Sequence, residues 1–161
     1  ITSFQNPEAD SSDSGYHLRQ SLIAIGSGGF FGVGLGQSKQ KALYIPEPYN
    51  DFIFSIIVEE TGFLGGMLII ALFIALIAAG INVAIKAKDM YGRLLSTGII
   101  SVVAIQLIIN VAVVTGSMPV TGIPMPFISY GGTSMVFIMA AMGILLNISK
   151  VSKSLEKNEL A

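Results

Sequence analysis

Three long apolar runs dominate the second half of the sequence and constrain the fold more than any other feature. They cover about residues 63–85, 94–114 and 130–149. A helix of roughly 20 apolar residues is long enough to cross about 30 Å of hydrocarbon, and it satisfies its own backbone hydrogen bonds there. We therefore expect an all-α polytopic membrane protein with three spanning helices in this chain.

The composition agrees with a membrane protein. Hydrophobic residues make up 52% of the 161 residues and charged residues 12%, whereas a soluble domain usually carries about a quarter charged residues. The net charge of −1 argues against nucleic acid as a partner, since nucleic-acid binding normally needs a clustered basic face. Because the chain has no cysteine, it has neither a disulfide framework nor a Cys-based metal site.

Basic residues are distributed unevenly around the apolar runs. The loop 86–93 and the tail 150–161 each carry three basic residues, whereas the loop 115–133 carries no charge. By the positive-inside rule, we predict that loop 86–93 and the tail are cytoplasmic and that residues 1–61 and 115–133 are external. Since the chain starts at Ile1, without an initiator methionine or an earlier insertion signal, we expect it to be the C-terminal part of a longer chain.

A glycine-rich stretch, residues 26–36, follows an expected helix over about residues 15–25. It reads GSGGFFGVGLG, which lacks the G-x-x-x-x-G-K-[ST] string and the strand-then-helix context of a nucleotide-binding loop. We therefore favour close packing of its backbone at a membrane surface over nucleotide binding.

An acidic segment, residues 46–60, separates the glycine-rich stretch from the first apolar run. It reads PEPYNDFIFSIIVEE. Carboxylates against a bilayer are costly unless they are solvated, paired or functional, so Glu47 and Asp51 need an explanation. Such a carboxylate suits a general base, a cation ligand or one half of a gating pair. The structural alternative is that Asn50 or Asp51 caps a helix over about residues 52–60.

Four further polar residues are candidates for binding. Arg19 and Lys41 lie on the same predicted face as the acidic segment, where they could pair with a phosphate-bearing head group or simply solvate a loop. Gln106 and Asn110 lie four residues apart in the second run and share a helix face. Polar residues in a span usually hydrogen-bond a neighbouring helix, and ligand contact is the alternative.

These segments together resemble the SEDS family (shape, elongation, division and sporulation), which includes FtsW, RodA and SpoVE. The resemblance is carried by the spacing of Gln106 and Asn110 and by three strings: NPEADSSDSGYHLRQS, GSGGFFGVGLGQSKQKALYIPEPYNDFIFSIIVEETGFLGG and PVTGIPMPFISYGGTS. It covers nearly the whole chain except the tail. The string GLGQSKQK is similar to the division and sporulation branch more than to the elongation branch.

The resemblance implies a ten-span bundle, of which this chain is the C-terminal part with a large external loop. It also implies a peptidoglycan glycosyltransferase that polymerises lipid II in the bacterial plasma membrane. The implied partners are a class B penicillin-binding protein and other divisome or elongasome proteins. Two other functions stay open: a lipid II transporter (flippase), and a non-catalytic scaffold for the penicillin-binding protein.

The resemblance also assigns roles to individual residues. The family's essential acidic residue falls on Asp51, which is the expected general base. Glu47 matches the acidic residue of the family's Pro-Glu step and Lys41 a basic residue in the same loop, and both are expected to bind substrate. Arg19, Gln106 and Asn110 complete the expected substrate-binding set. A divalent cation, Mg²⁺ or Mn²⁺, is expected at the pyrophosphate of the substrate, and its ligands are unknown.

Overall fold

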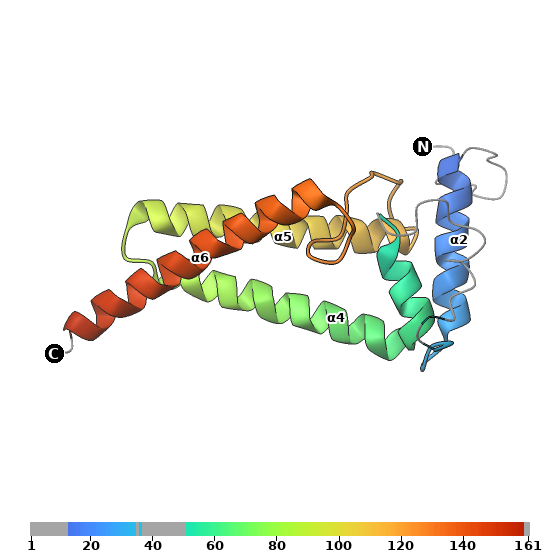
Figure 1. Cartoon of the computed structure of the whole chain (residues 1–161), viewed down its shortest axis with the longest axis horizontal. Coiled ribbons are helices and arrows are strands. Elements are labelled where there is room, and N and C mark those ends of the chain that lie inside the picture. Colours follow the sequence, from blue (N-terminus) through green and yellow to red (C-terminus); the bar gives the residue numbers. More distant parts are fainter. Residues whose placement is uncertain (1–12, 35, 37–50, 160–161) are drawn as a thin grey trace.

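The computed structural model describes residues 13–34, 36 and 51–159 (Figure 1). Its helices are α2 (Asp13–Gly28), α4 (Ile53–Lys86), α5 (Met90–Val114) and α6 (Gly132–Glu159). The described residues contain no strand, so the predicted all-α fold class is confirmed. Three stretches are long and apolar enough to cross a membrane: Ile53–Lys86, Met90–Val114 and Gly132–Ser154.

The helices α4 and α5 run antiparallel and are joined by a short turn at residues 87–89 (Figure 1). They approach closely at Gly80, where a Cβ atom would overlap the side chain of Ile100; small residues have this role at helix contacts in membranes. The helix α5 begins four residues before the second span expected from the sequence. The reason is Asp89, whose carboxylate accepts a 2.6 Å hydrogen bond from the amide of Gly92 and caps α5.

The helix α4 bends sharply at Gly62. This residue has a φ of 75° and a ψ of −175°, a backbone conformation that is open essentially to glycine. Residues 53–61 lie beside α2 across one end of the bundle, and the part of α4 after the bend runs along α5 (Figure 1). The bend falls between the short helix and the first spanning helix that the sequence predicts.

The glycine-rich turn after α2 provides hydrogen-bond partners for backbone groups that the bend in α4 leaves without partners in the helix. The amide of Val33 donates to the carbonyl of Glu59 at 3.0 Å, and the amide of Phe63 donates to the carbonyl of Gly29 at 2.9 Å. A broken helix leaves such groups without intrahelical partners, and leaving them unpaired when buried is costly. The turn and the bend therefore complete each other's backbone pairing.

Glycine is required where the two backbones meet. A Cβ atom on Gly28 or on Gly32 would overlap backbone atoms of residues 58–60 in α4, and a Cβ atom on Gly62 would overlap the backbone at Phe30 and Gly32. The glycine-rich stretch thus packs its backbone against α4, which is the arrangement that its sequence favours over a nucleotide loop.

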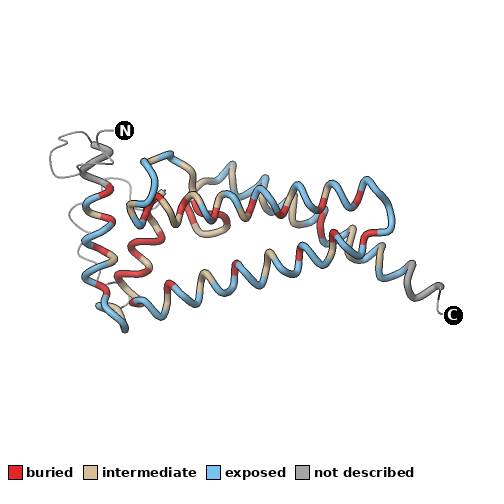
Figure 2. Tube along the Cα trace, turned by 180° about the vertical axis from the view of Figure 1, so that it is seen from behind, coloured by how far each residue is buried: buried red, intermediate tan, exposed pale blue. Residues whose placement is uncertain are grey.

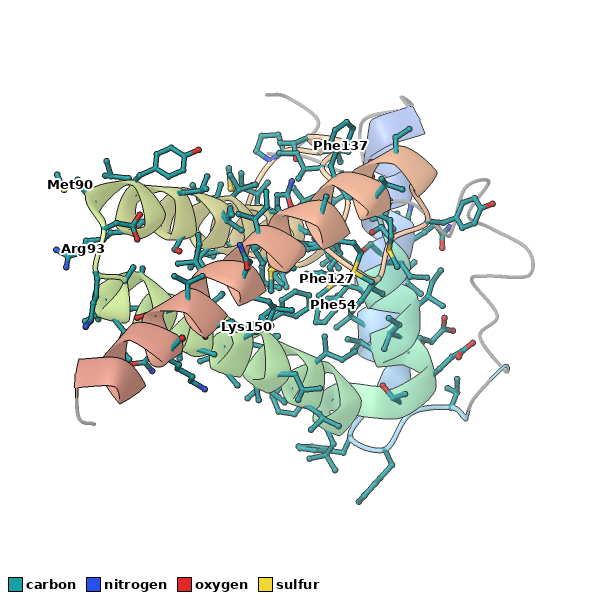
Figure 3. The ribbon with its side chains drawn as sticks, turned by 60° about the vertical axis from the view of Figure 1, so that its left-hand side comes forward. Phe54, Met90, Arg93, Phe127, Phe137 and Lys150 are labelled. Carbon is teal, nitrogen blue, oxygen red and sulfur yellow. The ribbon has the colours of Figure 1, made fainter. Side chains whose placement is uncertain are left out.

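Residues 123–129, in the second half of the loop between α5 and α6, pack against the bundle, whereas most of residues 115–122 are exposed. Met125 is 1% exposed, and its amide donates to the hydroxyl of Ser129 at 2.7 Å. The ring of Phe127 packs on that of Phe73 in α4, with ring centroids 6.3 Å apart, and Figure 3 shows Phe127 close to Phe54 in the interior. Protein therefore surrounds this non-helical backbone at Met125 and Pro126.

The helix α6 packs more loosely than the other two long helices. In the most apolar stretch of each helix, 33% of the residues of α5 are buried but only 6% of those of α6 (Figure 2). It continues to Glu159, ten residues beyond the expected span, because its Lys-, Leu- and Glu-containing end consists of good helix formers. The hydroxyl of Ser152 donates to the carbonyl of Lys86 at 2.5 Å, so this end of α6 lies beside the α4–α5 turn.

Candidate functional site

Asp51 stands immediately before α4, at the end of the bundle where α5 finishes. It is half-buried. The N-cap residue of α4 is the next residue, Phe52, and no side-chain hydrogen bond caps the helix there. The carbonyl of Phe52 accepts a 2.7 Å hydrogen bond from the hydroxyl of Ser55. The cap position is therefore one residue later than the sequence predicts, and the Asp51 carboxylate precedes it.

The loop between α5 and α6 brings Gly122 next to this carboxylate. A Cβ atom on Gly122 would lie 3.6 Å from Oδ2 of Asp51, so even the smallest side chain at this position would contact the carboxylate. Gly122 also has a φ of 70°, which glycine adopts without steric cost. Asp51 and the loop thus form two walls of one site.

The side chain of Asn110 joins these two walls. Asn110 lies in the last two turns of α5 and is 1% exposed. Its Nδ2 donates to the carbonyl of Asp51 at 2.9 Å and to the carbonyl of Ile123 at 3.0 Å. An amide nitrogen carries two hydrogens, so both are used. One buried side chain therefore fixes the peptide of Asp51 relative to the loop.

The orientation of this amide follows from its neighbours. The opposite assignment would place Oδ1 against two carbonyl oxygens, with no hydrogen between acceptors. In the orientation found, Oδ1 of Asn110 is buried and has no hydrogen-bond partner within the described ranges.

Gln106 lies one turn before Asn110 but faces a different neighbour. It lines a cavity of about 550 Å³ between α5 and α6, whose other lining residues are almost all apolar. Its Oε1 is buried and has no partner in the part of the chain that the structure describes. Although their spacing predicts a shared helix face, the two residues have different neighbours. Asn110 contacts the loop, and Gln106 faces α6.

The remaining candidates do not join this site in the described structure. Arg19 is exposed on α2, and the contacts of α2 are made by neighbours such as Ser21, whose hydroxyl donates to the carbonyl of Val114 at 3.0 Å. Lys41 and Glu47 lie outside the described residues. For a metal ion, no group of three or more His, Cys, Asp or Glu side chains gathers within residues 13–34, 36 and 51–159.

The predicted topology puts residues 119–126 on the same external side as Asp51 and beside it, but it does not single out Gly122 or Ile123 as parts of the site. The available signal is the string PVTGIPMP, residues 119–126, whose prolines and glycine indicate irregular backbone. That signal predicts a loop, but it does not indicate which loop atoms approach Asp51.

Two solved structures share this fold. A chain in a peptidoglycan synthase complex, solved to explain the structural coordination of polymerization and crosslinking, is 26% identical, with a TM-score of 0.75 over 92% of this chain and 40% of that one. A mutant of the rod shape determining protein RodA from Thermus thermophilus is 31% identical, with a TM-score of 0.62 over 81% of this chain and 39% of that one.

Curated relatives are similar over nearly the whole chain. Stage V sporulation protein E of Bacillus subtilis is 54% identical over 153 residues, 95% of this chain and 42% of the relative. A probable peptidoglycan glycosyltransferase FtsW of Geobacter is 46% identical over 149 residues, 92% of this chain and 41% of the relative. The chain thus spans about two fifths of the length of these relatives. A family model described as a cell cycle protein, covering FtsW, RodA and SpoVE, matches residues 1–154. The chain therefore belongs to the FtsW, RodA and SpoVE family of cell cycle proteins.

Proposed function

We propose that the full-length protein is a peptidoglycan glycosyltransferase that polymerises lipid II into glycan strands during cell division or sporulation. Relatives named as probable peptidoglycan glycosyltransferases and a sporulation protein support this proposal. The structural observation that supports it is the pairing of Asp51 with the loop: Asn110 holds the backbone carbonyls of Asp51 and Ile123 together, which keeps the peptide that bears the carboxylate beside the loop.

In the proposed reaction, Asp51 is the general base. Its carboxylate accepts the proton of the 4-hydroxyl group of the acceptor N-acetylglucosamine, and that oxygen forms a bond to the anomeric carbon of the donor N-acetylmuramic acid. The bond from this carbon to the pyrophosphate breaks, and undecaprenyl pyrophosphate leaves with the electron pair. Proton transfer of this kind typically contributes about 10²- to 10⁴-fold to the rate.

We assign Asn110 a positioning role in place of the substrate contact expected from the sequence. Both hydrogens of its Nδ2 are occupied by protein carbonyls, so that nitrogen has no donor left for a sugar. Gly122 contributes by its lack of a side chain, which leaves the space beside Oδ2 of Asp51 for the acceptor. Gln106 keeps its proposed role as a substrate contact through the apolar cavity that it lines, which suits a lipid chain.

Positive charge is needed to stabilise the leaving pyrophosphate. Arg19 and Lys41 are the protein groups that we propose for it, and Glu47 is a further proposed substrate contact. The proposed Mg²⁺ or Mn²⁺ would neutralise charge on the substrate's pyrophosphate; the described residues hold no group of three metal-ligating side chains to which it could be assigned.

The proposed location is the bacterial plasma membrane, which the protein crosses several times. The α4–α5 turn and the C-terminal part of α6 lie at the same end of the bundle, and their lysines favour the cytoplasmic side. Residues 1–61 and 115–133 then face the exterior, where the peptidoglycan layer is assembled. A class B penicillin-binding protein is the proposed transpeptidase partner; the similarity to a chain of a peptidoglycan synthase complex supports this.

Lipid II polymerisation and lipid II transport make opposite predictions for a purified system. The full-length protein, together with its penicillin-binding partner whose transpeptidase is blocked by penicillin, is reconstituted in vesicles that contain fluorescent lipid II. We expect long glycan strands on a gel and no faster movement of lipid II between leaflets. Lipid II movement without glycan strands would support the transporter. If an intact complex showed neither activity, this would support the scaffold.

The position of Asp51 favours polymerisation over transport. Transporters place their sites near the bilayer midplane, whereas Asp51 lies at the end of the bundle.

A further inference from the structure

A polar cavity opens between the last turns of α4 and the C-terminal part of α6, at the opposite end of the bundle from Asp51. Its volume is about 390 Å³, and its lining residues come from both helices: Ala79, Asn82, Val83 and Lys86 from α4, and Ser149, Ser152 and Lys153 from α6. A water molecule occupies about 30 Å³ in the liquid. The cavity therefore has room for roughly a dozen waters, which is ample for a phosphate group and its neighbouring atoms.

The lining changes from apolar to basic along the helix axis. Val83 and Ala79 line the cavity one and two turns before Lys86, which is the last residue of α4. Seven residues of helix rise about 10 Å, a distance that reaches from the edge of the hydrocarbon into the headgroup layer. The inner part of the cavity therefore has the apolar side chains of Ala79 and Val83 beside the amide of Asn82 on α4, and its outer part carries ammonium groups from both helices.

The charge at this end favours an anion. Residues 86–93 and 149–159 contain six basic and three acidic residues, a net charge of +3: Lys86, Lys88, Arg93, Lys150, Lys153 and Lys157, with Asp89, Glu156 and Glu159. The carboxylate of Asp89 is bound to the amide of Gly92 at the start of α5. None of the residues that line the cavity in the described structure is acidic.

We propose that this cavity binds the phosphate group of an anionic phospholipid. The ammonium groups of Lys86 and Lys153 pair with the phosphate, Asn82 and Ser149 donate hydrogen bonds to it, and the apolar wall of α4 contacts the first part of an acyl chain. The hydrogen bond from Ser152 to the carbonyl of Lys86 holds α6 against α4, so that both lysines border one cavity. This site is independent of the function proposed for Asp51.

A lipid suits the cavity better than a protein segment does. Lys86 and Lys153 are exposed, and they lie at the ends of membrane-length helices, where a bilayer has its head groups. Lysine can lay its apolar stem along a helix while its ammonium group reaches the interface. Basic pockets between spanning helices are a recurrent way of binding anionic head groups.

Native mass spectrometry of the full-length protein tests the proposal. The protein is released from nanodiscs that contain equal amounts of phosphatidylglycerol and phosphatidylcholine, and the retained lipids are counted. The test variant carries Lys86→Gln and Lys153→Gln. The control variant carries Lys88→Gln and Lys150→Gln, which remove the same charge at the same end of the bundle but do not line the cavity. Thermal unfolding of each variant shows whether it is folded.

Each lysine near a membrane surface contributes about 1 kcal/mol to binding of an anionic lipid, or about fivefold. The test variant should therefore bind phosphatidylglycerol about 25-fold more weakly, with phosphatidylcholine unchanged, while the control retains most of its phosphatidylglycerol. Equal losses in the two variants, or no loss in the test variant, would overturn the proposal. Competition by inorganic phosphate at the same concentration as the lipid would also overturn it, because the site would then bind the free anion.

Discussion

The two ends of the bundle are built in different ways. At the Asp51 end, segments far apart in the sequence are joined through backbone atoms: the glycine-rich turn pairs with the bend in α4, and Asn110 links two carbonyls. At the lysine end, a short turn connects α4 to α5, and one exposed hydrogen bond, from Ser152 to Lys86, holds α6. Backbone positions are thus fixed most closely where acid–base chemistry is proposed, and more loosely where only charge is needed.

Gly32→Ala should have the largest effect on this comparison. The new Cβ atom would overlap the carbonyl of Glu60, and Gly32 has a φ of 79°, which alanine adopts only with strain. We expect the free energy of unfolding to fall by about 3–5 kcal/mol, measured by thermal unfolding in detergent, or the full-length protein to fail to accumulate in the membrane.

The control for this variant is Gly26→Ala in α2. No atom lies within 4 Å of a Cβ placed there, and alanine favours a helix over glycine by up to about 1 kcal/mol. We expect Gly26→Ala to be neutral or slightly stabilising. Equal stability of the two variants would show that the glycine-rich turn does not pack against α4 as described.

Asn110→Leu should have the next largest effect. It leaves the partly buried carbonyls of Asp51 and Ile123 without the donor that joins them, and we expect it to lower the free energy of unfolding by about 1–3 kcal/mol. Asn110→Ser keeps one donor, and we expect it to lower kcat for lipid II polymerisation in the full-length complex while KM changes little, because a misplaced base slows chemistry more than binding.

Gln106→Leu is the matched control for stability. It makes the same change one turn away, where the amide oxygen has no partner in the described structure, so we expect no loss in thermal unfolding. If Gln106→Leu destabilised the protein as much as Asn110→Leu, the hydrogen bonds of Asn110 would not be what holds the loop.

The smallest expected effect is the difference in stability between alanine variants of two serines with similar hydrogen bonds. The hydroxyl of Ser21 donates to the carbonyl of Val114 in a buried setting, whereas that of Ser152 donates to the carbonyl of Lys86 in an exposed one. Ser21→Ala should cost about 1–2 kcal/mol and Ser152→Ala less than about 0.5 kcal/mol, both measured by chemical unfolding. A larger cost at Ser152 would contradict the contrast between the two ends.

The sequence predicts the spanning helices because bilayer thickness sets the length of each apolar run, and this information is local. It also predicts that residues 26–36 pack closely, since so many glycines permit little else. It does not predict that residues 123–129 pack against the bundle, because the burial of Met125 and the tilted contact of Phe127 with Phe73 depend on long-range packing.

The candidate site was predictable in part. Asp51 stands out in the sequence as a carboxylate beside a bilayer, and Asn110 as a polar residue within a span. Their connection is not visible there, because it runs from a side-chain amide to two backbone carbonyls. Every residue has a backbone carbonyl, so the residue types of Asp51 and Ile123 do not reveal that their carbonyls accept these hydrogen bonds.

The most direct test of the account is lipid II polymerisation by the full-length complex with Asp51→Asn, compared with Asp89→Asn. Both changes replace a carboxylate by an amide of nearly the same shape, and Asp89 lies at the other end of the bundle as the N-cap of α5, where asparagine caps equally well. With membrane levels and partner binding matched, we expect Asp51→Asn to lose about 10²- to 10⁴-fold in rate and Asp89→Asn to match the wild type. Glycan strands formed by Asp51→Asn at close to the wild-type rate would contradict the account.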